Sequence, residues 1–128
     1  MKLTISQALQ KGVEAHRGGK PQEAERFYRA ILGSQPSHPD ANHNLGVLTA
    51  SFSKFEEALP LFKTALEANP KKEQFWLSYI DALIKTEKLE EAKKVIVDAN
   101  QAGIATERLH VFEEQLKSEL SPSSDLPQ

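Results

Sequence analysis

The amino-acid sequence repeats itself at a fixed interval, and this interval constrains the fold more than any other feature. The dipeptide Glu-Ala occurs at positions 23–24, 57–58 and 91–92, which are evenly spaced. A fixed period of this length indicates stacked units that each bury an apolar face against a neighbour. The same period relates Phe27, Leu61 and Val95, then Tyr28, Phe62 and Ile96, then Ile31, Ala65 and Ala99, and the pairs Gly12–Gly46 and Pro36–Pro70.

Each unit is predicted to contain two helices. In the second unit, Pro39 suits the first turn of a helix, because its missing N–H has no intrahelical partner there. Ser53 and Glu56 have the spacing of a capping box, which predicts the start of the next helix. This helix contains Pro60, which costs it one hydrogen bond, and it ends before Pro70. The expected helices span about residues 5–17, 21–32, 39–52, 54–69, 73–85, 88–102 and 106–120.

The seventh of these helices follows the three units. Gly103 is placed to end the helix before it, and Thr106 is placed to cap its own start. Its apolar stripe consists of Leu109, Phe112, Leu116 and Leu120. These spacings keep one face apolar and the other polar. We therefore expect the helix to cover the apolar end of the third unit.

The residues that recur at this interval resemble the tetratricopeptide repeat, whose signature W-x2-L-G-x2-Y…A-x3-F…P recurs with the same period. The second unit matches best, through Leu45, Gly46, Ala58, Phe62 and Pro70. The resemblance implies an all-α fold, namely a right-handed superhelix of three helix pairs plus a capping helix. The expected domain spans residues 1–120, with repeats at about 5–38, 39–72 and 73–105, the capping helix at 106–120, and a flexible tail or linker at 121–128.

Three positions depart from the family pattern. Lys11 stands where leucine is usual, and Ile104 stands where the third unit would have proline. Ile80 replaces a small residue that lets the two helices of a pair approach closely. We therefore expect the third pair to pack at a different angle from the first two.

Composition excludes several classes of function. The chain has no cysteine, so disulfides, thiolate metal sites and cysteine nucleophiles are excluded. Its net charge is −2 without clustered Lys and Arg, which argues against binding to nucleic acid. No apolar run is long enough to span a membrane, and the N-terminus has no secretory signal. These observations predict a cytoplasmic protein.

No constellation of side chains indicates catalysis. The four histidines, at positions 16, 38, 43 and 110, lack the spacing at which a helix presents paired metal ligands. The sequence contains no phosphate-binding glycine loop and no nucleophile elbow. Phe75, Trp76 and Tyr79 are interpreted as core residues rather than as a base-stacking platform. We therefore expect neither an enzyme nor a bound metal or cofactor.

The family resemblance implies a concave groove lined by the first helix of each pair, which holds an extended peptide or a helix. Asn44 is the sharpest candidate, because its amide offers both a donor and an acceptor to a peptide bond. The carboxylate clamp of the best-known members is absent, because Leu9, Val13, Gln74 and Ser78 stand where it needs Lys, Asn or basic residues. An ordinary solvated helix face is the competing interpretation. The expected contact residues are Leu9, Val13, His16, Arg17, His43, Asn44, Val47, Ser51, Leu77, Asp81 and Lys85.

Three functions remain open from the sequence. The first is a protein-interaction module that binds a peptide or helix of a partner. The second is an N-terminal regulatory or substrate-recruiting segment of a larger bacterial enzyme, such as a glycosyltransferase or sulfotransferase, because residues 24–41 look like such arrays. The third is self-association, so the chain is expected to be a monomer or a weak homodimer.

Overall fold

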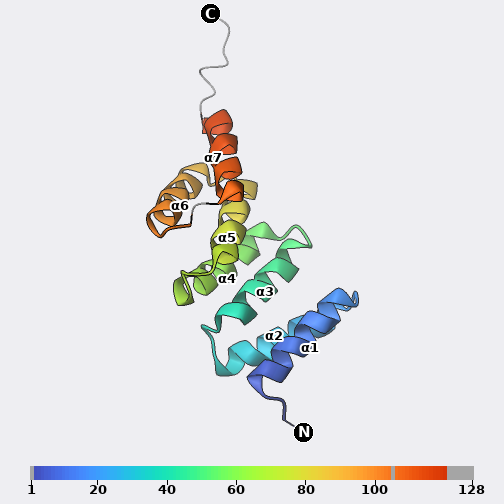
Figure 1. The fold of residues 1–128 in the computed structure, drawn as a ribbon. Coiled ribbons are helices and arrows are strands. Elements are labelled where there is room, and N and C mark those ends of the chain that lie inside the picture. The colour runs from blue at the N-terminus through green and yellow to red at the C-terminus, as the bar shows by residue number, and fades with distance from the viewer. Residues whose placement is uncertain (1, 105, 121–128) are drawn as a thin grey trace, which may run out of the picture.

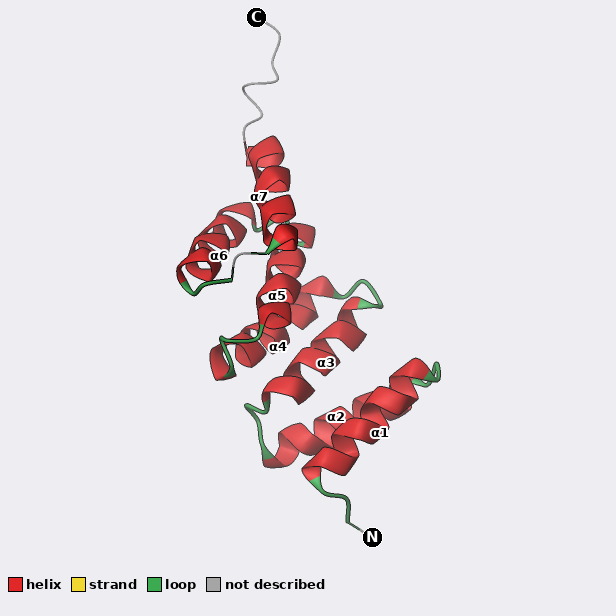
Figure 2. Ribbon diagram, viewed as in Figure 1, coloured by secondary structure: helices red, strands yellow, loops and turns green. Residues whose placement is uncertain are grey.

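The computed structural model describes residues 2–104 and 106–120, and this part of the chain is entirely helical apart from its turns (Figures 1 and 2). The predicted tail at 121–128 lies outside the described residues. Consecutive helices pack as antiparallel pairs that follow one another along the stack (Figure 1). The helices are α1 (Ile5–Arg17), α2 (Pro21–Ser34), α3 (Pro39–Ala50), α4 (Phe55–Ala68), α5 (Glu73–Lys85), α6 (Leu89–Gln101) and α7 (Glu107–Leu120).

The helix starts follow the sequence period. The first helices α1, α3, α5 and α7 begin at positions 5, 39, 73 and 107, and the second helices α2, α4 and α6 begin at 21, 55 and 89. Every interval between equivalent starts equals the interval between the Glu-Ala pairs. Helix α7 thus occupies the place of the first helix in a fourth unit, and it packs against both α5 and α6. The register therefore extends one helix beyond the three predicted pairs.

The turn inside each pair uses a left-handed residue. Gly19, Ser53 and Glu87 occupy equivalent positions of the three units and have φ values of 74°, 62° and 60°. The next residue in each turn is a lysine, whose N–H donates to a carbonyl five residues earlier. The predicted capping box at Ser53 is wrong, because its left-handed backbone ends the turn and α4 starts at Phe55 without a side-chain cap.

Two glycines allow close approach within the first two pairs. A Cβ atom added to Gly12 would lie 2.5 Å from Cε1 of Tyr28, and one added to Gly46 would lie 2.6 Å from Cε1 of Phe62. The third pair has the buried Ile80 at this position. Helices α5 and α6 accordingly approach each other over less of their length than the first two pairs do. The different packing angle expected for the third pair stays a prediction.

Each first helix presents three register positions toward the preceding pair. In α3 these are Ala41, Leu45 and Leu48, and all three are buried. In α5 and α7 the equivalent side chains are buried as well, except for Glu113, which is partly exposed in α7. In α1 they are the exposed Gln7, Lys11 and Glu14. The departure at Lys11 is thus explained, because this face of α1 meets solvent.

None of the described helices is long and apolar enough to cross a membrane.

Candidate functional site

The predicted contact residues lie on α1, α3 and α5 at equivalent register positions. Leu9, Val13 and Asn44 are half-buried, whereas Val47 is 36% exposed. At the C-terminal ends of these helices His16 and Asp81 are partly exposed, and Arg17, Ser51 and Lys85 are exposed. We call the set Leu9, Val13, Asn44, Val47, Ser78 and Asp81 the first-helix face.

Two of the predicted contact residues are buried, and this corrects the sequence-based expectation. Leu77 is 1% exposed and His43 is 8% exposed, so neither side chain is available on the surface. Leu77 belongs to the large apolar cluster that includes Leu109, Phe112 and Leu116 of α7. The burial follows from the register, because α7 packs beside α5 as the first helix of a further unit.

His43 joins the second and third units. Its Nε2 lies 2.8 Å from Oγ of Ser78 on α5, and its ring stacks 4.8 Å from that of Phe75. The Phe62 ring lies 5.6 Å away on the other helix of the pair. Burial lowers the pKa of His43; a hydrogen bond with Asn44 opposes this shift, nearby Lys72 reinforces it and Asp40 opposes it. The imidazole therefore acts as a neutral polar link inside the stack.

Asn44 also has partners within the protein. Burial raises the pKa of Tyr28, and a hydrogen bond with Asn44 partly offsets this rise. The same amide interacts with His43. Both effects place the Asn44 amide near Tyr28 of α2 and near His43, its neighbour on α3.

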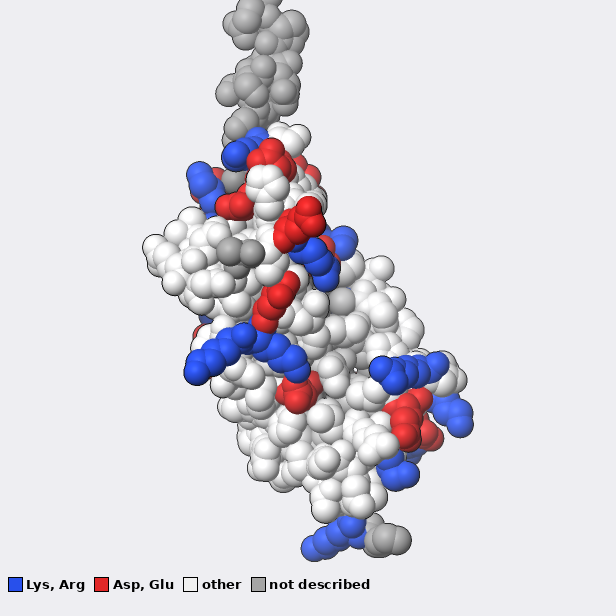
Figure 3. Space-filling view, viewed as in Figure 1, with Lys and Arg blue, Asp and Glu red and all other residues white. Residues whose placement is uncertain are grey.

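Two lysines around the first-helix face are paired with aspartates. Lys85 Nζ lies 3.0 Å from a carboxylate oxygen of Asp81, and Lys72 Nζ lies 3.3 Å from Asp40. Both lysines also lie over aromatic rings, Lys85 over Phe55 and Lys72 over Phe75. On the face drawn in Figure 3, basic and acidic residues are interspersed, with no large patch of a single sign. The electrostatics therefore favour no strongly charged ligand.

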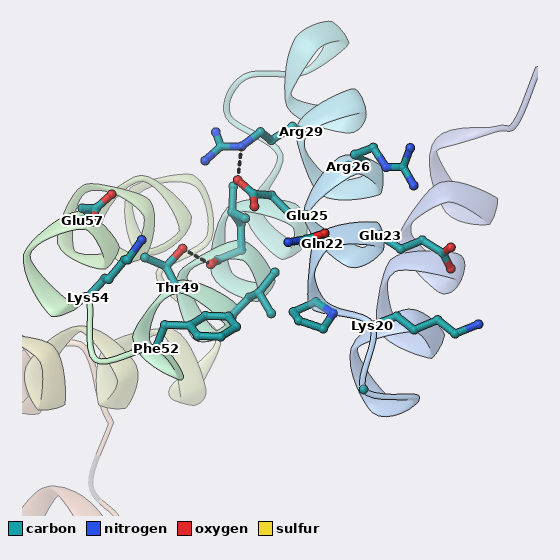
Figure 4. Close-up of a pocket in the computed structure, with 14 residues that line it drawn as sticks. Lys20, Gln22, Glu23, Glu25, Arg26, Arg29, Thr49, Phe52, Lys54 and Glu57 are labelled. Carbon is teal, nitrogen blue, oxygen red and sulfur yellow. Dashed lines mark hydrogen bonds and ion pairs between the residues drawn. The ribbon is translucent and has the colours of Figure 1, made fainter.

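A second candidate site is an open hollow of about 770 Å³ between α2, α3 and the start of α4 (Figure 4). Leu45, Leu48 and Pro21 provide its apolar lining, and Phe52 lies beside them with 57% of its surface exposed. Sequence reasoning missed this site, because Phe52 belongs to no repeated column. Its equivalents in the first and third units are Gly18 and Thr86, and this contrast is the only signal the sequence offers.

No cofactor or metal site accompanies these surfaces in the described ranges 2–104 and 106–120. They contain no group of three or more His, Asp or Glu side chains that could hold a metal ion. The same residues leave no buried side-chain nitrogen or oxygen without a hydrogen-bond partner.

Comparison with known proteins gives the class to which this architecture belongs. The sequence profile described as tetratricopeptide repeat matches residues 51–103. The tetratricopeptide domain of Sgt2 from Aspergillus fumigatus superimposes with a TM-score of 0.81 at 16% identity, over 97% of this chain and 85% of that one. No curated protein matches the chain by sequence.

Two further similar structures were determined with peptides. The first tetratricopeptide domain of Spaghetti (RPAP3), bound to the HSP90 peptide SRMEEVD, matches with a TM-score of 0.81 at 20% identity, over 91% of this chain and 93% of that one. The secretion chaperone SycD of Yersinia enterocolitica, in complex with a peptide of YopD, matches with a TM-score of 0.80 at 17% identity, over 94% and 98%. The chain therefore has the fold of the tetratricopeptide-repeat domains, and residues 51–103 match the profile of that family. As predicted, its fold is the right-handed superhelix of paired helices.

Proposed function

We propose that this protein is an interaction module that holds an extended, largely uncharged peptide of a partner against its first-helix face. The observation that carries the proposal is Val47, an exposed apolar side chain at the centre of α3, whose equivalent position in the first unit is the half-buried Val13 of α1, one turn after half-buried Leu9. An apolar strip flanked by a few polar groups supplies burial and register to a bound peptide.

The charge pattern supports an uncharged partner. Asp81 and Asp40 already neutralise Lys85 and Lys72 at 3.0 and 3.3 Å. A peptide carboxylate would have to displace one of these aspartates and be desolvated at the same time. Backbone amides and apolar side chains require no such exchange. Two structural relatives were solved with bound peptides, which makes peptide capture a natural use of the fold.

The proposal is tested by selection from a phage-displayed library of random dodecapeptides, followed by calorimetry with synthesised winners. We expect peptides rich in apolar residues and poor in Asp and Glu, with dissociation constants around the micromolar level, about −8 kcal/mol. Val47→Glu should remove binding, because it places an unpaired charge in the apolar strip. Val97→Glu is the matched control, since Val97 is 48% exposed on α6, away from this face.

The acidic peptide SRMEEVD provides the opposite arm of the same test. It should bind no better than a scrambled version, because Leu9, Val13, Gln74 and Ser78 supply no cation to its carboxylates. Enrichment of acidic peptides, or equal binding by the Val47→Glu and wild-type proteins, would refute the proposed site. Asn44→Ala is a secondary variant whose helical signal must be checked, because Asn44 also interacts with Tyr28 and His43.

A further inference from the structure

The contact between α3 and α5 is narrow and contains polar links between the second and third units. Helix α5 packs extensively on α4, whereas it meets α3 over a short stretch (Figure 1). Nε2 of His43 on α3 lies 2.8 Å from Oγ of Ser78 on α5 inside this stretch. The exposed pair Asp40 and Lys72 links the starts of the same two helices at 3.3 Å. Helices α3 and α5 can therefore move apart while α4 stays packed on α5, which is the geometry of a hinge.

His43 is the group in this contact that responds to pH near neutrality. Its side chain is 8% exposed, and its ring lies 5.6 Å from that of Phe62 on α4 and 4.8 Å from that of Phe75 on α5. Its hydrogen-bonding partner Ser78 is uncharged and also accepts a bond of 3.1 Å from the Gln74 amide. A proton on the ring would create a buried cation beside two aromatic rings and a neutral hydroxyl. This state is unfavourable unless the ring gains contact with water.

The surroundings of the ring act on its pKa in both directions. Burial lowers the pKa of His43, and the Asn44 amide opposes this shift. Lys72, directly before α5, lowers the pKa further, whereas Asp40 at the start of α3 raises it. In water a histidine has a pKa of about 6.5. An opened contact that exposes the ring therefore binds the proton more readily than the closed contact, so protonation favours opening as the pH falls below about 6.5.

We propose that the contact between α3 and α5 is a proton-operated hinge, in which protonation of His43 separates the two helices and widens the first-helix face. Val47 lies on α3, and Ser78 and Asp81 lie on α5. Opening thus moves the apolar strip away from the polar groups of the third unit. The free chain has this property whether or not a peptide binds. Release of a bound peptide in weak acid is a consequence that rests on the proposed function.

Distances between nitroxide spin labels, measured by electron paramagnetic resonance, test the hinge directly. The chain has no cysteine, and Arg17, Ser51 and Lys85 are exposed at equivalent positions after or at the ends of α1, α3 and α5. Labels at Ser51→Cys and Lys85→Cys span the α3–α5 contact, and labels at Arg17→Cys and Ser51→Cys are the matched control across α1 and α3. Between pH 7.5 and 5 the first distance should grow by about 3 Å or more, the room that a bridging water needs, while the second stays constant. No change in the first pair, or an equal change in both pairs, overturns the proposal.

Two charge variants separate proton control from mechanical weakening. Lys72→Gln and Asp40→Asn break the same ion pair, so mechanical weakening alone would shift the opening in the same direction in both. Protonation of His43 predicts opposite shifts, with opening at higher pH in Lys72→Gln and at lower pH in Asp40→Asn. His43→Gln should abolish the pH dependence, because glutamine keeps a neutral polar group at this place. Shifts in one direction, or an unchanged pH dependence in His43→Gln, contradict the hinge.

Peptide affinity distinguishes the hinge from the proposed peptide site. A selected peptide without Asp, Glu or His should bind the wild-type protein at least about fivefold more weakly at pH 5 than at pH 7.5, the lower end of ordinary coupling between two sites. His43→Gln should bind it equally at both, and His16→Gln, at a partly exposed histidine on α1, should keep the wild-type behaviour. If no peptide binds at pH 7.5 while the label distances respond, the proposed function fails and the hinge stands. Equal binding by the wild-type protein at both pH values overturns the release of peptide.

Discussion

At the scale of single residues, His43 shows how one polar side chain joins two units of the stack. The ring is 8% exposed, contacts Ser78 through Nε2 and packs against Phe75. Protonation would place a charge among aromatic rings and near Lys72, whose charge opposes it, while the charge of Asp40 favours it. The link between α3 and α5 therefore depends on a neutral imidazole.

This dependence predicts a loss of stability in weak acid. The pKa of His43 is lowered in the folded state, whereas the unfolded chain has the ordinary value of about 6.5. Below pH 6.5 the unfolded chain binds the proton more readily, so the free energy of unfolding falls as pH falls toward the folded pKa. The melting temperature should drop between pH 7.5 and 5, and His43→Gln should reduce that drop. His110→Gln serves as the control, and an unchanged drop in His43→Gln would place the effect elsewhere.

At the scale of elements, the close approach of paired helices depends on single atoms. Gly12 and Gly46 lie in helix interiors, where glycine normally weakens a helix by about 1 kcal/mol relative to alanine. They are explained by the rings of Tyr28 and Phe62, which fill the space a Cβ atom would need. The gain from packing these rings thus outweighs the cost of helical glycine.

Two alanine substitutions separate these effects. Gly46→Ala should lower the free energy of unfolding by about 1–2 kcal/mol, because overpacking exceeds the gain in helix propensity. Gly33→Ala near the end of α2 should raise it by up to about 1 kcal/mol, since no atom lies within 4 Å of the added Cβ. Urea denaturation of both variants measures the difference. Equal midpoints would show that the pairs do not pack through the Gly46–Phe62 contact.

The helices also show which features of the fold could be predicted from the sequence and which could not. The predicted and observed starts of the described helices agree to within one residue, because the apolar columns and prolines repeat at a fixed interval. The capping box at Ser53 is wrong, since a Ser-x-x-Glu spacing does not reveal that the serine has a left-handed backbone. The burial of Leu77 escapes prediction because it depends on α7, whose place in the register is a tertiary property. The remaining contact residues of the first-helix face stay a prediction.

At the scale of the whole molecule, the apolar core is divided unevenly along the stack. One large cluster extends over α4 to α7 and includes Phe75, Trp76 and Leu109, whereas two small clusters hold α1 and α2 against α3. Each unit of such a stack contacts only its neighbours, so opening can begin at the less stable end.

This division predicts that the first pair opens before the rest of the molecule. Among the helices of residues 2–104 and 106–120, α3 is the one that packs extensively on α1 and α2, and the opposite face of α1 carries the exposed Gln7, Lys11 and Glu14. Native-state hydrogen exchange should therefore show amides of α1 exchanging at least tenfold faster than those of α5, a difference of about 1.4 kcal/mol or more in opening free energy. Leu45→Ala should widen the gap, because Leu45 is 1% exposed and belongs to the small cluster that joins α2 to α3. Leu83→Ala in α5 should reduce the difference in exchange rate between α1 and α5, because it weakens the large cluster. Equal protection of α1 and α5 in the wild-type protein would mean that the stack unfolds as one cooperative unit, and the uneven core would then have no bearing on its dynamics.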